Sequence, residues 1–177
     1  MNTQPVFVIS SHLKSFAFLA PCTTLAALAL CLLASGCAVR SVQPGASREE
    51  ALLRYGTPSR VVALASGTRL QYSRQPAGQS AVMVDLDAAG SVMSVREVLN
   101  PAGFSQVVAG QSTREDTERA LGRPASVDRV ASWAGDILTY RWRDRDQDML
   151  YWFYLDARQV VQRAEYAAEI RIWPNDD

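Results

Sequence analysis

The chain has 177 residues, 18 basic and 18 acidic side chains and a formal net charge of zero, which does not favour a nucleic-acid partner. Its only histidine and its only lysine are His12 and Lys14. From residue 37 onward the chain therefore lacks the groups for Ser-His or Cys-His nucleophile activation, for a zinc site of the usual His/Cys type and for a Schiff base. We expect a protein that is not an enzyme and that holds no metal and no cofactor.

Residues 1–36 have the pattern of a lipoprotein signal peptide. An apolar run over 16–33 is followed by Ala-Ser-Gly and then Cys37, although Ala34 stands where leucine is commonest. Cleavage before Cys37, with acylation of its thiol and its new amino group, would anchor the chain firmly, because several acyl chains hold a protein where one holds it weakly. An uncleaved membrane span is the alternative, since the run is just long enough to cross a bilayer. Residues 37–44 would form a short tether.

Two later stretches repeat one set of helix signals: SREEALLRYGTPSRV from Ser47 and TREDTERALGRPASV from Thr113. Each begins with a capping box, in which a hydroxyl residue is followed three positions later by an acidic one. Each ends in a glycine able to take a left-handed conformation, with a proline two residues further on. These pairs are Ser47 with Glu50, Thr113 with Asp116, Gly56 with Pro58, and Gly122 with Pro124. Recurrence of both ends at matching offsets favours an internal duplication.

Each helix is followed by segments with the period-two alternation of β-strands, separated by turn residues. After the first helix they are 60–65, 68–74, 80–87 and 91–99, and after the second they are 126–131, 136–144, 149–156 and 160–167. Gly67 corresponds to Gly135, Tyr72 to Tyr140, and the pair Leu86-Asp87 to Leu155-Asp156. Strands joined by short turns predict two antiparallel meanders.

The predicted fold class is α+β, a tandem repeat of a helix-plus-antiparallel-sheet unit with one or two short helices on three or four strands. The first repeat would span 45–99, the linker helix and second repeat 100–170, and a tail 171–177. Helices of about eight residues are marginal alone, so they must pack an apolar face on the sheet. The candidate contacts are Leu52, Tyr55, Ala120 and Leu121, and the linker adds Phe104, Val107 and Val108.

The second stretch resembles the SmpA/OmlA (BamE-like) family of outer-membrane lipoproteins. The resemblance lies in a glycine, a capping residue, an acidic-capped helix ending in Leu-Gly-x-Pro and an aromatic strand: Gly110, Thr113, Leu121, Gly122, Pro124, Tyr140, Trp142 and Arg143. The first stretch supplies Gly45, Ser47, Gly56, Pro58 and Tyr72, with Tyr55 where leucine is usual. BamE has one such unit and this chain has two. The motif is short and determines fold more than binding.

The resemblance implies a periplasm-facing lipoprotein of the outer membrane. Ala38 after the cysteine, in place of aspartate, is typical of export to that membrane in lipoproteins. The implied function is a non-catalytic protein-interaction or scaffold module, with the β-barrel assembly machine as partner and anionic phospholipid as a further contact. Tandem copies of such a unit also occur in secreted β-lactamase inhibitor proteins. The alternative function is therefore a binding inhibitor of a periplasmic enzyme.

The segment 139–156 is rich in aromatic residues and is the candidate interface. Tyr140 and Trp142 share one strand face opposite Arg141 and Arg143, whereas the next strand is apolar on both faces. The surplus apolar face must be buried against the other repeat or against a partner. Trp, Tyr and Arg are common at binding hot spots, so the candidate interface residues are Tyr72, Tyr140, Trp142, Arg143, Trp152 and Tyr154. The acidic stretch 144–148 fails the EF-hand template and is interpreted as a hairpin turn.

Overall fold

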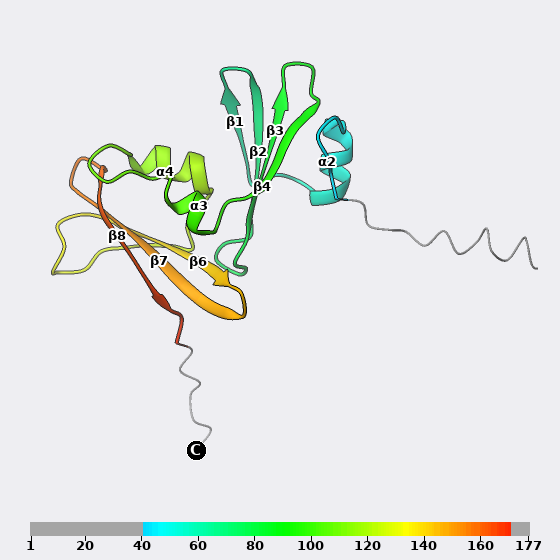
Figure 1. Ribbon diagram of the computed structural model, residues 1–177. Coiled ribbons are helices and arrows are strands. Elements are labelled where there is room, and N and C mark those ends of the chain that lie inside the picture. The colour runs from blue at the N-terminus through cyan, green and yellow to red at the C-terminus, as the bar shows by residue number, and fades with distance from the viewer. Residues whose placement is uncertain (1–40, 171–177) are drawn as a thin grey trace, which may run out of the picture. The chain divides into compact units, whose positions relative to one another are not determined.

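The computed structural model describes residues 41–170, which belong to one compact unit. The predicted signal peptide, Cys37 and the predicted tail 171–177 lie outside the described residues. The fold class is α+β: two four-stranded antiparallel sheets with a few short helices (Figure 1). Its elements are, in order, α2 (Arg48–Tyr55), β1 (Arg60–Leu64), β2 (Gly67–Ser73), β3 (Ala81–Asp87), β4 (Val92–Glu97), α3 (Pro101–Phe104), α4 (Arg114–Leu121), β5 (Ser126–Asp128), β6 (Ile137–Asp144), β7 (Gln147–Leu155) and β8 (Val161–Ala168). None of the helices among the described residues is long and apolar enough to cross a membrane.

Both predicted capping boxes are present. The Ser47 side chain accepts from the Glu50 amide, and the Thr113 side chain accepts from the Asp116 amide, with the reciprocal bonds also formed. Both helices end at glycines with positive φ, 79° at Gly56 and 82° at Gly122. Their ψ angles of −154° and −170° are extended, so these residues lie in a region open essentially to glycine alone. The two glycines therefore do not take the left-handed conformation that the sequence predicted, although both helices end at them.

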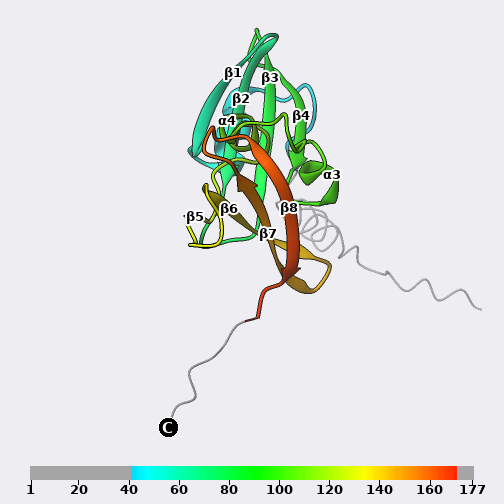
Figure 2. The same cartoon turned by 90° about the vertical axis from the view of Figure 1, so that its left-hand side faces the viewer.

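The strands pair in sequence order, β1-β2-β3-β4 in the first sheet and β5-β6-β7-β8 in the second. Seven strands agree with the predicted segments to within about two residues. The exception is β5, which keeps only three residues of the predicted 126–131. Figure 2 shows β8 beside β7, at the edge of the second sheet. The predicted linker helix is the short α3, capped by the Asn100 side chain, which accepts from the Gly103 amide.

Helices pack on both faces of the first sheet. Leu70, Tyr72 and Val84 face α2, where they surround the fully buried Ala51. The opposite face of the same strands carries Ala81 and Met83, which belong to one buried cluster with Leu121 of α4. Val42 also packs with the α2 cluster and is only 8% exposed, so part of the predicted 37–44 tether belongs to the folded unit.

Side chains on the α4 side of the first sheet also donate hydrogen bonds to carbonyl groups at the C-terminal end of α4. The last carbonyl groups of a helix have no partner within it. The buried Gln71 amide donates to the carbonyl oxygens of Glu118 at 3.1 Å and Arg119 at 2.9 Å. Arg69 adds a third bond, to the Arg119 carbonyl at 3.2 Å. The first sheet thus holds the C-terminal turn of a helix that also belongs to the second half of the chain.

An ion-pair cluster lies beside this contact. Asp85 accepts from Arg69 Nε at 2.6 Å and Nη2 at 2.9 Å, and from Arg96 Nη2 at 3.0 Å. Burial disfavours the charged form of Asp85, but hydrogen bonds and charge from the two arginines outweigh that effect and hold its pKa below the ordinary value of 3.8. The carboxylate is therefore charged and paired at neutral pH.

Candidate interaction surface

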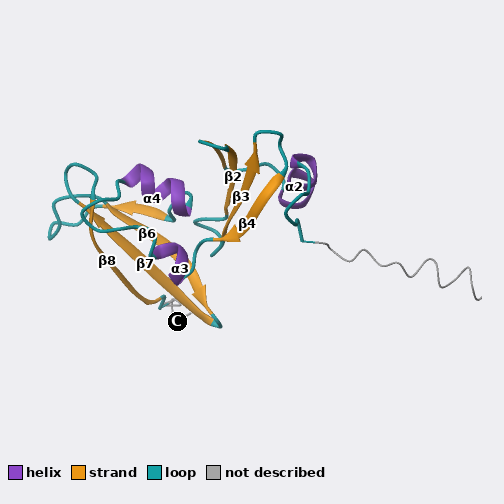
Figure 3. Ribbon diagram, turned by 45° about the horizontal axis from the view of Figure 1, so that its top comes forward, coloured by secondary structure: helices purple, strands orange, loops and turns teal. Residues whose placement is uncertain are grey.

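The alternation of side chains along a strand divides the five predicted interface residues of β6 and β7 between two faces of the second sheet. Helices α3 and α4 lie on one side of this sheet (Figure 3). Tyr140 and Trp142 point to that side, where they are 0% and 4% exposed. Both are core residues that a partner cannot touch, so their prediction as interface residues is wrong. The sequence could not assign them, because helices covering either face would suit the same alternation.

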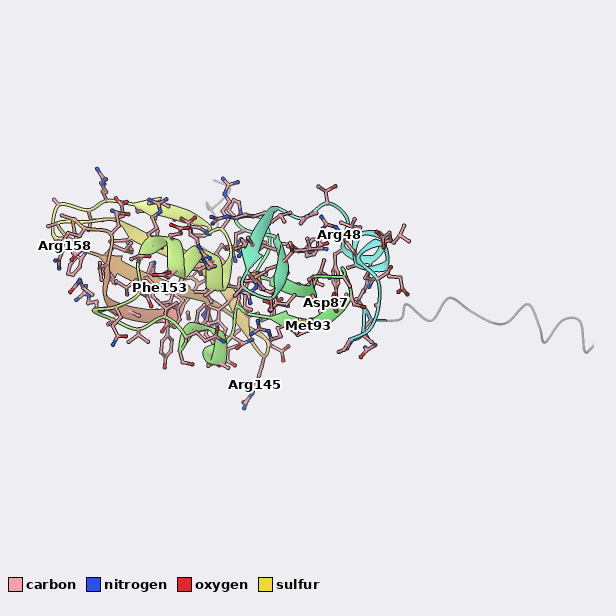
Figure 4. The ribbon with its side chains drawn as sticks, turned by 90° about the horizontal axis from the view of Figure 1, so that it is seen from above. Arg48, Asp87, Met93, Arg145, Phe153 and Arg158 are labelled. Carbon is pink, nitrogen blue, oxygen red and sulfur yellow. The ribbon has the colours of Figure 1, made fainter. Side chains whose placement is uncertain are left out.

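The covered side is filled with aromatic rings. Phe104 of α3 stacks on Tyr151 with the ring centroids 4.0 Å apart, and it meets the Trp142 ring in a T-shaped arrangement with the centroids 5.4 Å apart. The Tyr140 hydroxyl donates to the carbonyl of Gly122 at 2.9 Å, which joins β6 to the end of α4. Burial strongly raises the pKa of Tyr140. Figure 4 labels Phe153 within this cluster and Arg145 projecting from the turn between β6 and β7.

The other side, called the outer face here, carries Leu150, Trp152 and Tyr154 on β7. All three are half-buried, and within residues 41–170 no helix lies over them. The neighbouring strands add Arg141 and Arg143 from β6 and Arg163 and Glu165 from β8, by the register in which Arg141 faces Leu150 and Glu165 faces Trp152. Of the predicted interface residues, Arg143, Trp152 and Tyr154 therefore share one face.

One end of the outer face is covered by Trp133, which the sequence analysis did not single out. Its indole Nε1 donates to the Leu155 carbonyl at 2.7 Å, and its ring meets Tyr154 edge-on at 5.3 Å. The Arg163 guanidinium lies 4.1 Å from the Tyr154 ring centroid and 5.2 Å from that of Trp133. The sequence signal that could have identified Trp133 is a single tryptophan among small residues. The loop that carries it follows β5.

The charges on the outer face are paired. Arg143 contacts Asp148 at 3.1 Å, Arg141 contacts Glu169 at 3.0 Å, and Arg163 contacts Glu165 at 3.4 Å. The Tyr154 hydroxyl donates to Glu165 at 3.2 Å. The outer face is thus an apolar strip on β7 flanked by ion pairs, a composition that resembles the centre and rim of protein interfaces.

Tyr72 lies elsewhere, on the α2 side of the first sheet. It is 8% exposed, and its ring centroid is 5.2 Å from that of Tyr55. The structure does not bring it together with the outer face. Among residues 41–170, no group of three or more His, Cys, Asp or Glu side chains is placed to hold a metal ion.

No family model matches the sequence, and no curated protein does. Among solved structures, the chain is similar to the crystal structure of a DUF4309 family protein, YjgB, from Bacillus subtilis subsp. subtilis str. 168. The two share 16% sequence identity over 73% of this chain and 84% of that chain, with a TM-score of 0.30. A likeness at this level carries no argument about fold or function.

Proposed function

We propose that the chain is a lipoprotein anchored through Cys37 to the periplasmic face of the outer membrane, where it acts as a non-catalytic protein-binding module. Its partner in this proposal is a component of the β-barrel assembly machine, which binds to the outer face of the second sheet. The resemblance to SmpA/OmlA lipoproteins supports the location and the partner. The geometry of the two halves supports the site.

We further propose that the two halves are copies of one unit, because the same hydrogen bonds recur in both. The Gly45 amide donates to the Val92 carbonyl at 2.7 Å, and the Gly110 amide donates to the Val161 carbonyl at 2.7 Å. A Cβ atom at Gly67 would lie 2.0 Å from the Leu86 carbonyl oxygen, and one at Gly135 would lie 1.9 Å from that of Leu155. Such close approaches require glycine at both places.

The same turn also recurs after β3 and β7. The Asp87 carboxylate accepts from the Ala89 and Ser91 amides, each at 2.9 Å. The Asp156 carboxylate accepts from the Arg158 and Val160 amides, also each at 2.9 Å. Agreement at the level of single hydrogen bonds supports duplication more strongly than sequence identity does.

The binding proposal rests on a difference between corresponding faces of the two sheets. A helix covers this face in the first sheet, and no described helix covers it in the second. In the first sheet Gln71 is paired with Met83, and in the second Thr139 is paired with Trp152. Met83 belongs to the cluster that buries α4 of the following unit, whereas the equivalent Trp152 is half-buried beneath no described helix. We infer that the outer face receives a short helix of the partner in the way that the first sheet receives α4.

The test is capture of the tagged, lipidated protein from outer membranes in mild detergent, with identification of the co-purifying proteins. Trp152→Ala should remove the barrel-assembly components, because it deletes the centre of the apolar strip. Tyr166→Ala is the matched control, since Tyr166 is 66% exposed on the opposite face of the same sheet. Equal recovery with both variants would contradict the proposed site. Recovery of a soluble periplasmic enzyme in place of these components would favour the inhibitor alternative.

A further inference from the structure

Strand β8 forms a long free edge of the second sheet (Figure 2). It has 8 residues, and every one after Val161 is exposed. It contains no proline, and within residues 41–170 the only strand beside it is β7. An open edge of this kind is a place where another strand can add its own backbone hydrogen bonds. The proposed binding of a partner helix to the outer face does not use it.

The pairing with β7 shows which backbone groups of β8 are open. The Glu169 amide donates to the Asp148 carbonyl at 2.8 Å, in continuation of the β7–β8 register. Along an antiparallel strand, successive residues direct their N–H and C=O groups alternately toward one neighbour and toward the other side. The residues whose backbone groups point away from β7 are therefore Ala164, Tyr166 and Ala168.

The opposite edge of the sheet shows how this chain covers such groups. Beyond the end of β5, the Gln75 side chain bonds both backbone groups of Arg141: its amide donates to the carbonyl, and its oxygen accepts from the amide at 3.3 Å. Within residues 41–170, no side chain bonds the open backbone groups of β8 in this way. The β8 edge is thus left available for pairing.

A row of stacked aromatic rings ends at the same edge. Phe104 stacks on Tyr151, and Tyr151 stacks on Tyr166 with the ring centroids 6.0 Å apart and the planes 15° apart. Tyr166 is the last ring of the row and is 66% exposed. Side chains directly opposite each other on antiparallel strands are in contact. A second copy with its own Tyr166 opposite this one would therefore continue the row.

The charges of β8 restrict how it can pair with β8 of a second copy. Open residues pair only with open residues, so a two-fold axis places one residue of the strand opposite itself. A centre at Arg163 or Glu165 would place like charges opposite each other. A centre at Ala167 would do the same with Glu165 and Glu169. Such pairs destabilise a sheet.

Of the two remaining centres from Arg163 to Ala167, one is blocked. A centre at Ala164 would carry the second copy past Val161, whose amide and carbonyl already bond residues 112 and 110 at 2.9 and 2.7 Å. A centre at Tyr166 avoids this segment and places Arg163 opposite Glu169 of the second copy. Opposite charges at such positions stabilise strand pairing.

We propose that the protein forms a symmetric dimer in which β8 pairs antiparallel with β8 of a second copy, with the two-fold axis at Tyr166. The backbone groups of Ala164 bond those of Ala168 in the other copy, and those of the two Tyr166 residues bond each other. Arg163 pairs with Glu169 of the other copy. The two second sheets become one continuous sheet, and the outer face of each copy stays open because the added strand lies in the plane of the sheet.

Cysteine cross-linking of the full chain in mild detergent tests the dimer and its register. In Tyr166→Cys chains the two thiols lie on residues directly opposite each other, with Cα atoms about 5.5 Å apart, a distance that a disulfide spans. Oxidation should therefore double the apparent mass on a non-reducing gel. Ala164→Cys is the matched control, because residues 164 of the two copies lie about 13 Å apart along the strands. The unsubstituted chain gives the background from its own three cysteines.

Two further experiments keep the test independent of the lost tyrosine ring. A mixture of Ala164→Cys and Ala168→Cys chains should cross-link, whereas neither chain alone should do so. Adding Ala164→Pro to Tyr166→Cys should abolish the cross-link while circular dichroism stays unchanged, because proline fits an edge strand where the missing N–H points outward. Ala164→Ser keeps that N–H and should leave the cross-link intact.

Three results would overturn the proposal. The first is that neither Tyr166→Cys nor the mixed chains cross-link above the background of the unsubstituted chain. The second is that Ala164→Cys alone cross-links as strongly as Tyr166→Cys, which would indicate random collision. The third is that the cross-link persists with Ala164→Pro in the chain.

Discussion

Tyr72 and Tyr140, which correspond in the proposed duplication, should respond in opposite ways to loss of the hydroxyl group. Tyr140→Phe removes the 2.9 Å hydrogen bond to the Gly122 carbonyl and leaves that buried acceptor unpaired. Such a loss costs about 1–3 kcal/mol of unfolding free energy. Tyr72→Phe removes a buried hydroxyl that has no partner among the described residues, so it removes a desolvation cost and should raise stability by about 1 kcal/mol.

Urea unfolding followed by tryptophan fluorescence measures both effects. The midpoint should fall for Tyr140→Phe and rise slightly for Tyr72→Phe, with the slope of free energy against urea unchanged. The corresponding melting temperatures should differ from wild type by about 4 °C for each kcal/mol, given a domain of this size. Destabilisation of similar size in both variants would refute the reasoning, because it would mean that Tyr72 has a hydrogen-bond partner in solution.

Three further predictions concern the core, an ion pair and the anchor. Trp142→Ala should lower the unfolding free energy by about 3–5 kcal/mol, since the side chain is buried, whereas Trp152→Ala on the outer face should cost much less; equal losses in a urea titration would contradict the assignment of faces. Asp85 has a depressed pKa in the folded state, so its ion pairs stabilise the fold above pH 3.8 and this contribution is lost as pH falls through the lower folded value. Unfolding curves at pH 7 and pH 3 should show that Asp85→Asn is destabilised at pH 7 and loses part of its acid sensitivity, while Asp144→Asn behaves as wild type. Cys37→Ser should abolish labelling by a radioactive fatty acid and leave the precursor uncleaved; retained labelling would sink the lipoprotein assignment.

Local signals in the sequence predicted the local structure well. The capping pairs, the two glycines and the strand alternation each act over a few neighbouring residues, so their physical causes are contained in short segments. The same alternation could not decide which face of a strand is covered. By pattern, Tyr140 and Trp152 suit the core and an interface equally well. Their burial differs because α3 and α4 pack on only one side of the second sheet.

Contacts between distant segments were also beyond sequence reasoning. The bonds from Gln71 to the end of α4 join residues 47 and 48 positions apart. In the sequence, nothing about Gln71 indicates that it is buried or that its amide donates to the carbonyl groups of a distant helix. The missing hydrogen bond of the Tyr72 hydroxyl was equally hidden, although Tyr55 and Arg54 in the first stretch stand where the second has Leu121 and Ala120.

The position of α4 determines what would happen if further repeat units were added to such a chain. Each sheet is closed on one side by its own helix, and the first sheet is closed on its other side by the helix that comes after it. If the halves are copies, as we propose, adding units would move the open face to the new last sheet without removing it. In repeat proteins, the exposed apolar face of the last repeat is avoided by an atypical terminal unit. In this chain, a partner helix on the outer face of the second sheet would serve that purpose.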